Sequence, residues 1–274
     1  MRNLAALHRQ IHAQWAHIVE DSGVQYKAHD FLPAGIKLFG SSTKTQLSSE
    51  VGVITKVLYM SPAKESGVEM CSPYATRACK SVCLGHNSGR LAMAPHKRAR
   101  LWKTALFLGN YDYFCALAMC EVDALARKAA TLHLEPAIRF DGSTDTGIGF
   151  NYAAVRPELR FYDYTKDAQR ARRSLQCANY DVTLSYNGEN WVDCAHFLGA
   201  GGRVAVVFDV QKGAELPDFL DGFPVVDGDQ HDATWTHAPG VVIGLRLKAA
   251  ANKQKMRKLG LGSGFVVSPA EHSR

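Results

Sequence analysis

The sequence contains no long hydrophobic run. Although 46% of its 274 residues are hydrophobic, no stretch approaches the roughly 18 consecutive apolar residues that mark a candidate transmembrane helix. The first twenty residues also lack the apolar core of a secretory signal, because Arg2, His8 and Arg9 stand where that core would lie. We therefore expect no membrane span, and a chain that stays in the cytoplasm where it is made.

The absence of a secretion signal decides how the seven cysteines are interpreted. In a reducing cytoplasm thiols stay free, so a close group of cysteines indicates a metal site or catalysis rather than disulfides. Such a group is formed by Cys71, Cys79 and Cys83. We expect the remaining four to be structural, and two of them fall within an apolar helical pattern, where a thiol is usually a small buried hydrophobe. The four are Cys115, Cys120, Cys177 and Cys194.

The three grouped cysteines are separated by seven and by three residues. Cys79 and Cys83 are four positions apart, so on one helical turn their sulfurs would share a face. Cys71 lies across a loop containing Pro73, which can fold back toward that face. The polar neighbours of these cysteines argue against a buried apolar core at this place. The segment therefore predicts three thiolates converging on one metal centre.

The identity of the metal is left open between two alternatives. A structural zinc site requires four ligands, usually as two short pairs, and only one pair is present unless His86 completes a Cys3His set. An iron–sulfur cluster matches three cysteines on one loop better, because a [4Fe–4S] cubane can leave its fourth iron free for another ligand. We expect the cluster, with zinc as the alternative.

Short apolar segments recur at fairly regular intervals along the second half of the chain. Continuous apolar strands separated by crossovers predict a parallel sheet covered on both faces. Eight such strands predict an α/β fold of (β/α)-barrel type, irregular or partly open because the last crossovers are short, with its site at the carboxyl ends of the strands. The strands are expected at residues 51–60, 137–140, 159–162, 182–185, 204–208, 225–226, 241–247 and 265–267.

Helical patterns occupy residues 1–20, 95–108 and 111–130, with Asn110 as a cap for the third. Residues 21–50 are interpreted as loop. We expect residues 1–35 to form an N-terminal helical extension, and residues 36–274 to form a single barrel-like domain that carries the cysteine loop.

Polar residues follow several of the expected strands, where they would gather at one edge of the sheet. Such groups suit acid–base chemistry or ligand anchoring, although Asp and Gly after a strand also make ordinary solvated turns. The residues expected to be catalytic are Asp141, Lys166, Asp229 and His231. Those expected to bind a cofactor or ligand are Arg139, Asp145, Tyr164, Ser185, Asn187 and Asp227.

The formal net charge of +6 suits a small anionic or nucleotide-like ligand, or nucleic acid. Basic stretches lie at residues 96–103, 166–173 and 246–258. Most such runs are solvated helix faces, and little aromatic interleaving is present for stacking on bases.

Four segments together resemble a known family. They are LYMSPA and the cysteine segment that follows from Leu58, FYDYTK at 161–166, VVDGDQHD at 225–232 and SGFVV at 263–267. This set is similar to a family of phage-encoded proteins, the gene product eighty-eight domain, whose function is largely uncharacterised. The resemblance covers nearly the whole chain after about residue 35, and it implies a viral origin and a location in the host cytoplasm.

A three-cysteine loop after the first strand of a barrel also resembles the radical S-adenosylmethionine (SAM) enzymes, whose cluster leaves one iron open for SAM. The chain departs from their cysteine spacing, and Asp141-Gly142-Ser143 stands where they carry a glycine-rich motif. Two functions are therefore weighed. One is a cluster-dependent enzyme, with SAM as a candidate cofactor. The other is a non-catalytic phage accessory protein with a structural zinc ion, which binds nucleic acid or a host protein.

Overall fold

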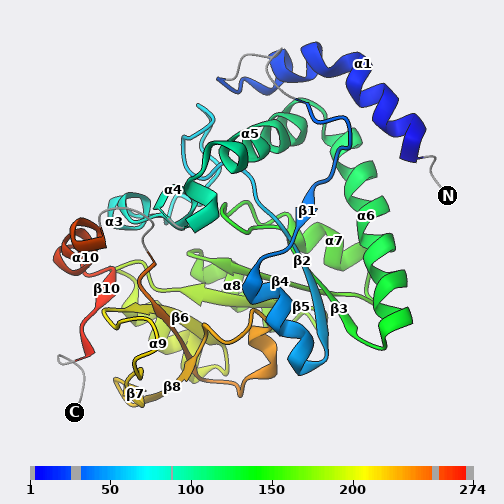
Figure 1. The fold of residues 1–274 in the computed structure, drawn as a ribbon. Coiled ribbons are helices and arrows are strands. Elements are labelled where there is room, and N and C mark those ends of the chain that lie inside the picture. The colour runs from blue at the N-terminus through cyan, green and yellow to red at the C-terminus, as the bar shows by residue number, and fades with distance from the viewer. Residues whose placement is uncertain (1–3, 26–31, 88, 249–252, 270–274) are drawn as a thin grey trace.

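The computed structural model describes residues 4–25, 32–87, 89–248 and 253–269, which adopt an α/β architecture (Figure 1). Within these residues ten strands form one open sheet in the order β1-β2-β3-β4-β5-β6-β9-β8-β7, and β10 pairs with β6. The strands are β1 (Phe39–Gly40), β2 (Val53–Leu58), β3 (Glu135–Arg139), β4 (Arg160–Thr165), β5 (Tyr180–Ser185), β6 (Arg203–Phe208), β7 (Phe219–Leu220), β8 (Phe223–Asp227), β9 (Val242–Arg246) and β10 (Val266–Val267).

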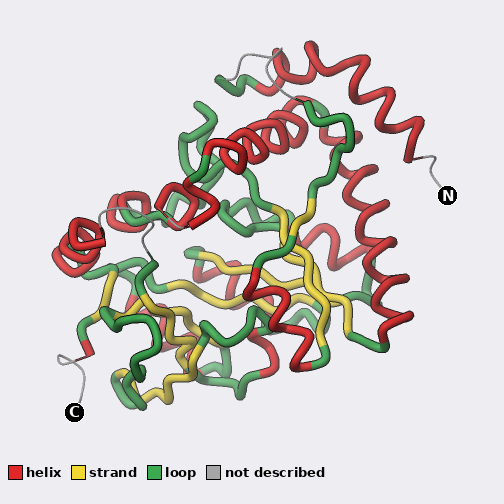
Figure 2. Tube along the Cα trace, viewed as in Figure 1, coloured by secondary structure: helices red, strands yellow, loops and turns green. Residues whose placement is uncertain are grey.

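The long helices α1, α5 and α6 lie to one side of the strands (Figure 2). The α-helices are α1 (Leu4–Ser22), α2 (Thr43–Leu47), α3 (Arg77–Ser81), α4 (Leu84–Asn87), α5 (Ala94–Gly109), α6 (Tyr111–Leu132), α7 (Gly149–Val155), α8 (Ala168–Ser174), α9 (Trp191–Gly199) and α10 (Lys253–Gly262). Three short 3₁₀ helices are η1 (Ser48–Val51), η2 (Gly89–Ala92) and η3 (Thr234–Thr236).

The middle of the sheet is parallel. Strands β2, β3, β4, β5 and β6 pair in chain order, and β9 and β8 continue the parallel arrangement. Strand β10 pairs with β6 at Val207 and Phe208, beyond the point where the pairing with β5 ends at Ala205. Successive parallel strands need crossover connections, and helices α6 to α9 supply them. As a result, the carboxyl ends of these strands all lie at one edge.

All eight predicted strands are present, and each pairs in parallel with at least one other of them, although β9 lies between β6 and β8, and β10 pairs with β6. The two-residue strands β1 and β7 were not predicted; they pair antiparallel with β2 and β8 at the two edges of the sheet. Because the described strands end in these separate edges, the sheet is open and the predicted closure of a barrel is not confirmed.

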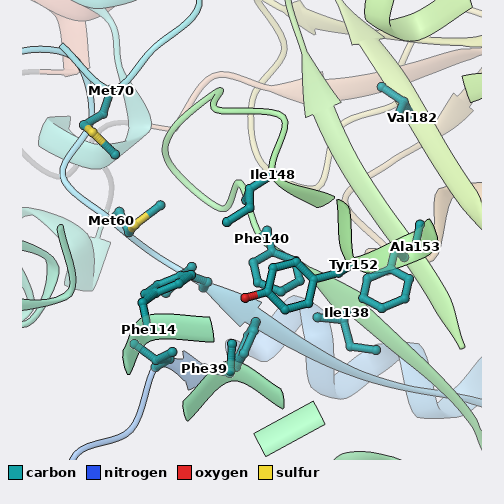
Figure 3. Close-up of a cluster of buried hydrophobic side chains, with 14 of the residues drawn as sticks. Phe39, Met60, Met70, Phe114, Ile138, Phe140, Ile148, Tyr152, Ala153 and Val182 are labelled. Carbon is teal, nitrogen blue, oxygen red and sulfur yellow. The ribbon is translucent and has the colours of Figure 1, made fainter. Parts of the chain in front are cut away.

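One face of the sheet packs against the helices. Alternate strand residues such as Phe140, Phe161, Leu184 and Phe208 are fully buried there, together with apolar residues from α5 and α6. Helix α1 packs on α5 and α6, so its residues join the same core. Figure 3 draws Met60 next to the aromatic rings of this core and Met70 farther along the same side, and both belong to the core. The segment leading to the cysteines is therefore anchored in the main hydrophobic core.

The opposite face, which we call the inner face, is covered in part by residues 228–240, the plug loop. Its Ala233 packs against Val53, Ala137 and Tyr162 from three neighbouring strands. The Oγ1 atoms of Thr183 and Thr234 lie 3.1 Å apart, and the guanidinium of Arg203 donates to carbonyl groups of the plug loop. The plug loop thus takes the space that a closed barrel would fill with side chains from further strands.

Side chains, rather than strand pairing, connect the two ends of the sheet. Lys44 on α2, just before β2, forms an ion pair of 3.2 Å with Asp232 of the plug loop after β8. The Asp232 N–H also donates to the hydroxyl of Ser48 on η1 at 3.3 Å. These contacts explain how an open sheet keeps its inner face covered.

The helical predictions for residues 1–20, 95–108 and 111–130 are confirmed by α1, α5 and α6, and Asn110 caps α6 by accepting from the Tyr113 N–H. The prediction of loop over residues 21–50 is wrong at residues 39–50, where β1, α2 and η1 lie; residues 26–31 are outside the described part. Helix α2 begins with a reciprocal hydrogen-bonded cap between Ser42 and Thr45.

The packing of α1 on α5 can be tested with one methyl group. Gly109 and Gly199 each end a helix, but a Cβ on Gly109 would overlap the backbone carbonyl of Ile18, whereas a Cβ on Gly199 would meet nothing within 4 Å. We expect Gly109→Ala to lower the free energy of unfolding by about 1–3 kcal/mol, because it forces α1 away. Gly199→Ala should be neutral or stabilising by up to about 1 kcal/mol. Urea unfolding measures both, and equal effects would contradict this packing.

Candidate metal centre at the carboxyl edge of the sheet

The three grouped cysteines lie between β2 and α4, and all three are free and partly exposed. Cys79 is on α3, whose N-cap Thr76 accepts from the Cys79 N–H at 3.2 Å. Helix α3 ends at Ser81, and Val82 leaves the helical conformation with φ −107° and ψ 16°. The prediction that Cys79 and Cys83 share one helical turn is therefore wrong, since Cys83 lies between α3 and α4.

The carboxyl end of β5 holds the first half of the cysteine loop. The side-chain amide of Asn187, just after β5, donates to the Tyr74 carbonyl at 3.0 Å. In return, the hydroxyl of Thr76 donates to the Asn187 carbonyl at 2.9 Å. Because Asn187 is buried, these bonds are shielded from water and fix the loop on the strand end.

The loop after β3 holds the chain at two points between β2 and Cys71. The Asp145 N–H donates to the Met70 carbonyl at 3.1 Å, and the Ser143 hydroxyl donates to the Met60 carbonyl at 2.6 Å. That loop is shaped by Asp141, whose carboxylate accepts from Thr144 Oγ1 at 2.7 Å and from the Gly147 N–H at 2.8 Å. The buried carboxylate of Asp141 is therefore occupied by its own loop.

A buried ion pair supports the cysteine loop from the helix side. Arg100 on α5 donates to both carboxylate oxygens of Glu65, at 3.0 and 2.7 Å, and to the Leu91 carbonyl at 2.7 Å. The two side chains are only 2% and 3% exposed. His86 adds its Nδ1 atom at 3.6 Å from Glu65. Burial alone would raise the pKa of Glu65, but hydrogen bonds from His86 and Arg100 hold it at about 2.

Burial and the neighbouring cysteines change the pKa of two thiols in the loop. Burial raises the pKa of Cys71 to about 12, and the nearby Cys83 and Cys79 add to the rise, against the Ala63 N–H that donates to the Cys71 sulfur at 3.1 Å. Burial also raises the pKa of Cys83. Thiols in such a setting stay protonated at neutral pH unless a cation binds them.

Lys166, just after β4, interacts electrostatically with the three cysteines. Burial would lower the pKa of its ammonium group, but negative charge on Cys79, Asp145 and Cys83 raises it. Lys166 is therefore a positive charge held beside the sulfurs. Its neighbour Asp145 accepts from the Lys166 N–H at 2.9 Å and from Arg170 at 2.5 Å, so that this carboxylate too is already paired.

The predicted site residues separate into two groups. One group surrounds the cysteine loop or lies on the strands below it; it comprises Arg139, Asp141, Asp145, Tyr164, Lys166, Ser185 and Asn187. The other group belongs to the β8–β9 region: Asp227 pairs with Arg246 at 2.8 Å, Asp229 pairs with Lys248 at 2.7 Å, and His231 stacks on His237 in the plug loop. No contact joins Asp227 or Asp229 to the cysteine loop within the described residues.

Sequence reasoning missed Lys44 and Glu65, which shape this region, and did not place a third residue, Asp163, among the expected site residues. Lys44 lies in the polar run that was interpreted as loop, where the Ser42–Thr45 spacing was the available sign of a helix. Asp163 is fully buried between the Asp141 N–H at 2.7 Å and the Tyr180 hydroxyl at 2.9 Å, and burial raises its pKa. Glu65 carried no sequence signal, because its partner Arg100 is distant along the chain.

Across the described part of the chain, no three His, Cys, Asp or Glu side chains lie close enough to hold one metal ion. In the same ranges, no helix is both long and apolar enough to cross a membrane. The metal centre itself stays a prediction, supported by the loop's anchoring and by the chemistry of its thiols.

The fold defines the class of protein: an α/β protein with an open, mostly parallel sheet and a cysteine loop at the carboxyl edge of that sheet. The chain matches the Gene product 88 family over residues 36–259 and belongs to that family, as its sequence motifs implied. No curated protein and no solved structure matches the chain, so the resemblance to radical SAM enzymes finds no support there. The location in the host cytoplasm stays a prediction.

The Glu65–Arg100 pair predicts a large loss of stability when one partner is removed. We expect Arg100→Met to lower the free energy of unfolding by about 3 kcal/mol or more, because it leaves a buried carboxylate without its main partner. The exposed pair of Arg172 and Asp193, at 45% and 46% exposure, is the matched control, and Arg172→Met should cost less than about 1 kcal/mol. Urea unfolding at pH 7 provides the comparison.

The same pair gives a dependence on pH. A carboxyl whose pKa is lowered by folding contributes stability that is present above its ordinary value of 4.5 and is lost as the pH falls toward about 2. The stability difference between the wild-type protein and Arg100→Met should therefore shrink across this interval. A difference that stays constant down to pH 2 would contradict the pairing.

Proposed function

We propose that this chain is an iron–sulfur protein whose Cys71, Cys79 and Cys83 hold a [4Fe–4S] cluster, and that it is a cluster-dependent enzyme. The observation that carries the proposal is the setting of these cysteines: three free thiols on a loop tied to the ends of β3 and β5, with the positive charge of Lys166 interacting with them. The carboxyl edge of a parallel α/β sheet is the usual place for an active site.

The number of thiols favours a cluster over a single ion. A structural zinc site requires four ligands. A cubane can be held by three cysteines, because its fourth iron can stay free for another ligand. The count of three thiols on one loop fits a cluster that has one iron without a protein ligand.

Hydrogen bonds and charge around the sulfurs also suit a cluster. The Ala63 N–H already donates to the Cys71 sulfur at 3.1 Å, and backbone N–H groups of Gly85 and His86 act on Cys83. Such donors and a buried cation stabilise the negative charge of a thiolate-bound cluster. Lys166 is the cation that this structure offers.

A bound cluster would supply electron transfer and one iron atom without a protein ligand, where a small anionic or nucleotide-like ligand can bind. The chain's own contribution is positioning. Asn187 and Thr76 hold the loop over the strand ends, and Lys166 brings a positive charge toward a ligand at this edge. SAM is one candidate for that ligand.

A second function is favoured by one contact. The Nδ1 atom of His86 lies 3.6 Å from Glu65, and a metal-bound histidine commonly pairs one ring nitrogen with a carboxylate while the other binds the metal. A Cys3His zinc site in a non-catalytic accessory protein that binds nucleic acid or a host protein is therefore the alternative. Whether His86 binds the metal distinguishes the zinc site from the three-cysteine cluster.

The first test is metal content after purification without oxygen. We expect about four irons and four sulfides per chain and a brown colour. Cys79→Ser should lose most of the iron, whereas the control Cys177→Ser, which changes a cysteine outside the loop, should keep it. His86→Ala should keep the iron of a three-cysteine cluster but would empty a Cys3His zinc site. A colourless protein without iron and sulfide would overturn the proposal.

The charge of Lys166 provides a second test. Because a buried positive charge favours the more negative, reduced state of a cluster, Lys166→Gln should make the cluster harder to reduce. Lys128→Gln is the control, since Lys128 is exposed on α6 and outside the cysteine loop. Potentiometric titration followed by paramagnetic resonance measures both. Equal potentials in the two variants would place Lys166 away from the cluster.

A further inference from the structure

Two cations share a single aromatic ring on the inner face of the sheet. The guanidinium carbon of Arg139 lies 4.4 Å from the ring centroid of Tyr164, and the Lys44 ammonium lies 6.0 Å from the same centroid. Arg139 and Tyr164 come from the adjacent strands β3 and β4, and Lys44 comes from α2. Their side chains are largely covered, with 15% exposure for Arg139 and 21% for Lys44.

One carboxylate faces these two cations. Asp232 forms ion pairs with Lys44 at 3.2 Å and with Arg139 at 3.5 Å, and it accepts from the Tyr162 hydroxyl at 2.8 Å. The nearby Asp181 does not correct the balance, since it pairs with Arg203 at 2.9 Å. The group of Lys44, Arg139 and Asp232 therefore carries one excess positive charge in a place that is mostly removed from water.

Two polar atoms beside these cations have no partner in the part of the chain that the structure describes. They are the hydroxyl oxygen of Tyr164 and the Nδ1 atom of His231, both buried. Both groups can donate a hydrogen bond. Lys44 connects them, because it lies over the Tyr164 ring and its charge acts on His231. Buried polar atoms are rarely left unsatisfied, so such a pair calls for a partner.

The missing partner is an acceptor. Arg139 donates from its Nε atom to the Asp141 main-chain carbonyl and from its Nη1 atom to the Asp232 carboxylate. In the described residues its Nη2 atom has no hydrogen-bond partner. Excess positive charge together with unused donors is the arrangement that recognises an oxyanion. A neutral ligand would leave the charge unbalanced, and a cation would be repelled.

We propose that the inner face binds the oxyanion group of a small ligand, a carboxylate or a phosphate, between Arg139, Lys44 and the Tyr164 hydroxyl. Lys166 comes just after β4, two positions beyond Tyr164, where its charge interacts with Asp145 and the cysteines at the carboxyl edge. A ligand anchored by its anionic end at Arg139 can thus extend toward Lys166 and the cysteine loop. The proposal concerns the inner face alone and does not require that the cysteines hold a cluster.

Two tyrosines on one strand provide the test. The hydroxyl of Tyr162 is bonded to Asp232, whereas the hydroxyl of Tyr164 has no partner in the described residues. Without added anion, Tyr162→Phe should lower the unfolding temperature and Tyr164→Phe should leave it unchanged or slightly raised. With inorganic phosphate or malonate, the wild-type protein should be stabilised relative to sodium chloride at equal ionic strength.

Calorimetric titration with the same probes then measures the affinity. Tyr164→Phe should bind the preferred anion about tenfold more weakly, and Lys44→Met should lose binding. A response to phosphate alone indicates a phosphorylated ligand, and a response to malonate alone indicates a carboxylic acid. The proposal is overturned if neither probe binds, if both variants bind as tightly as the wild-type protein, or if Tyr164→Phe is destabilised without anion, which would mean that ordered water satisfies the hydroxyl.

Discussion

The parallel alignment of β2, β3, β4 and β5 is the constraint on which the candidate site depends. It brings the residues after each strand to the same edge, so that Asn187 after β5, Lys166 at the end of β4 and the loop after β3 all meet the cysteine loop after β2. No single contact would hold three thiols together on such a loop. The combined hydrogen bonds from two strand ends and the buried Glu65–Arg100 pair beneath it do.

The inner face presents a second arrangement that follows from the open sheet. The edge strands do not pair with each other. The plug loop instead covers the part of this face formed by Val53, Ala137 and Tyr162, using Ala233 and Trp235. Further toward the carboxyl edge, polar and charged side chains replace the apolar ones. The face thus changes from apolar packing around Ala233 to the polar pair Arg139 and Tyr164 nearer the carboxyl edge, and a ligand would meet charged side chains at that end.

Much of this architecture could be predicted from local sequence patterns. A strand buried on both faces is a continuous apolar run, which is why β4, β5 and β6 were found, whereas β1 and β7 are too short to produce any pattern. The openness of the sheet could not be predicted, because it depends on contacts such as that between Asp232 and Ser48, 184 positions apart. The site was predicted unevenly for the same reason. Cys71, Cys79 and Cys83 form a motif in one segment, while Glu65 and Lys44 gain their roles only from distant partners.

The central claim is that three cysteines of one loop hold a cubane with one iron lacking a protein ligand. Mössbauer spectroscopy of the anaerobically purified, iron-57-enriched protein tests it most directly. The account predicts a [4Fe–4S] signal in which roughly one iron in four responds when a small ligand is added and the other three do not. A spectrum without cluster iron, or one in which all four irons stay equivalent with every ligand tried, would contradict it.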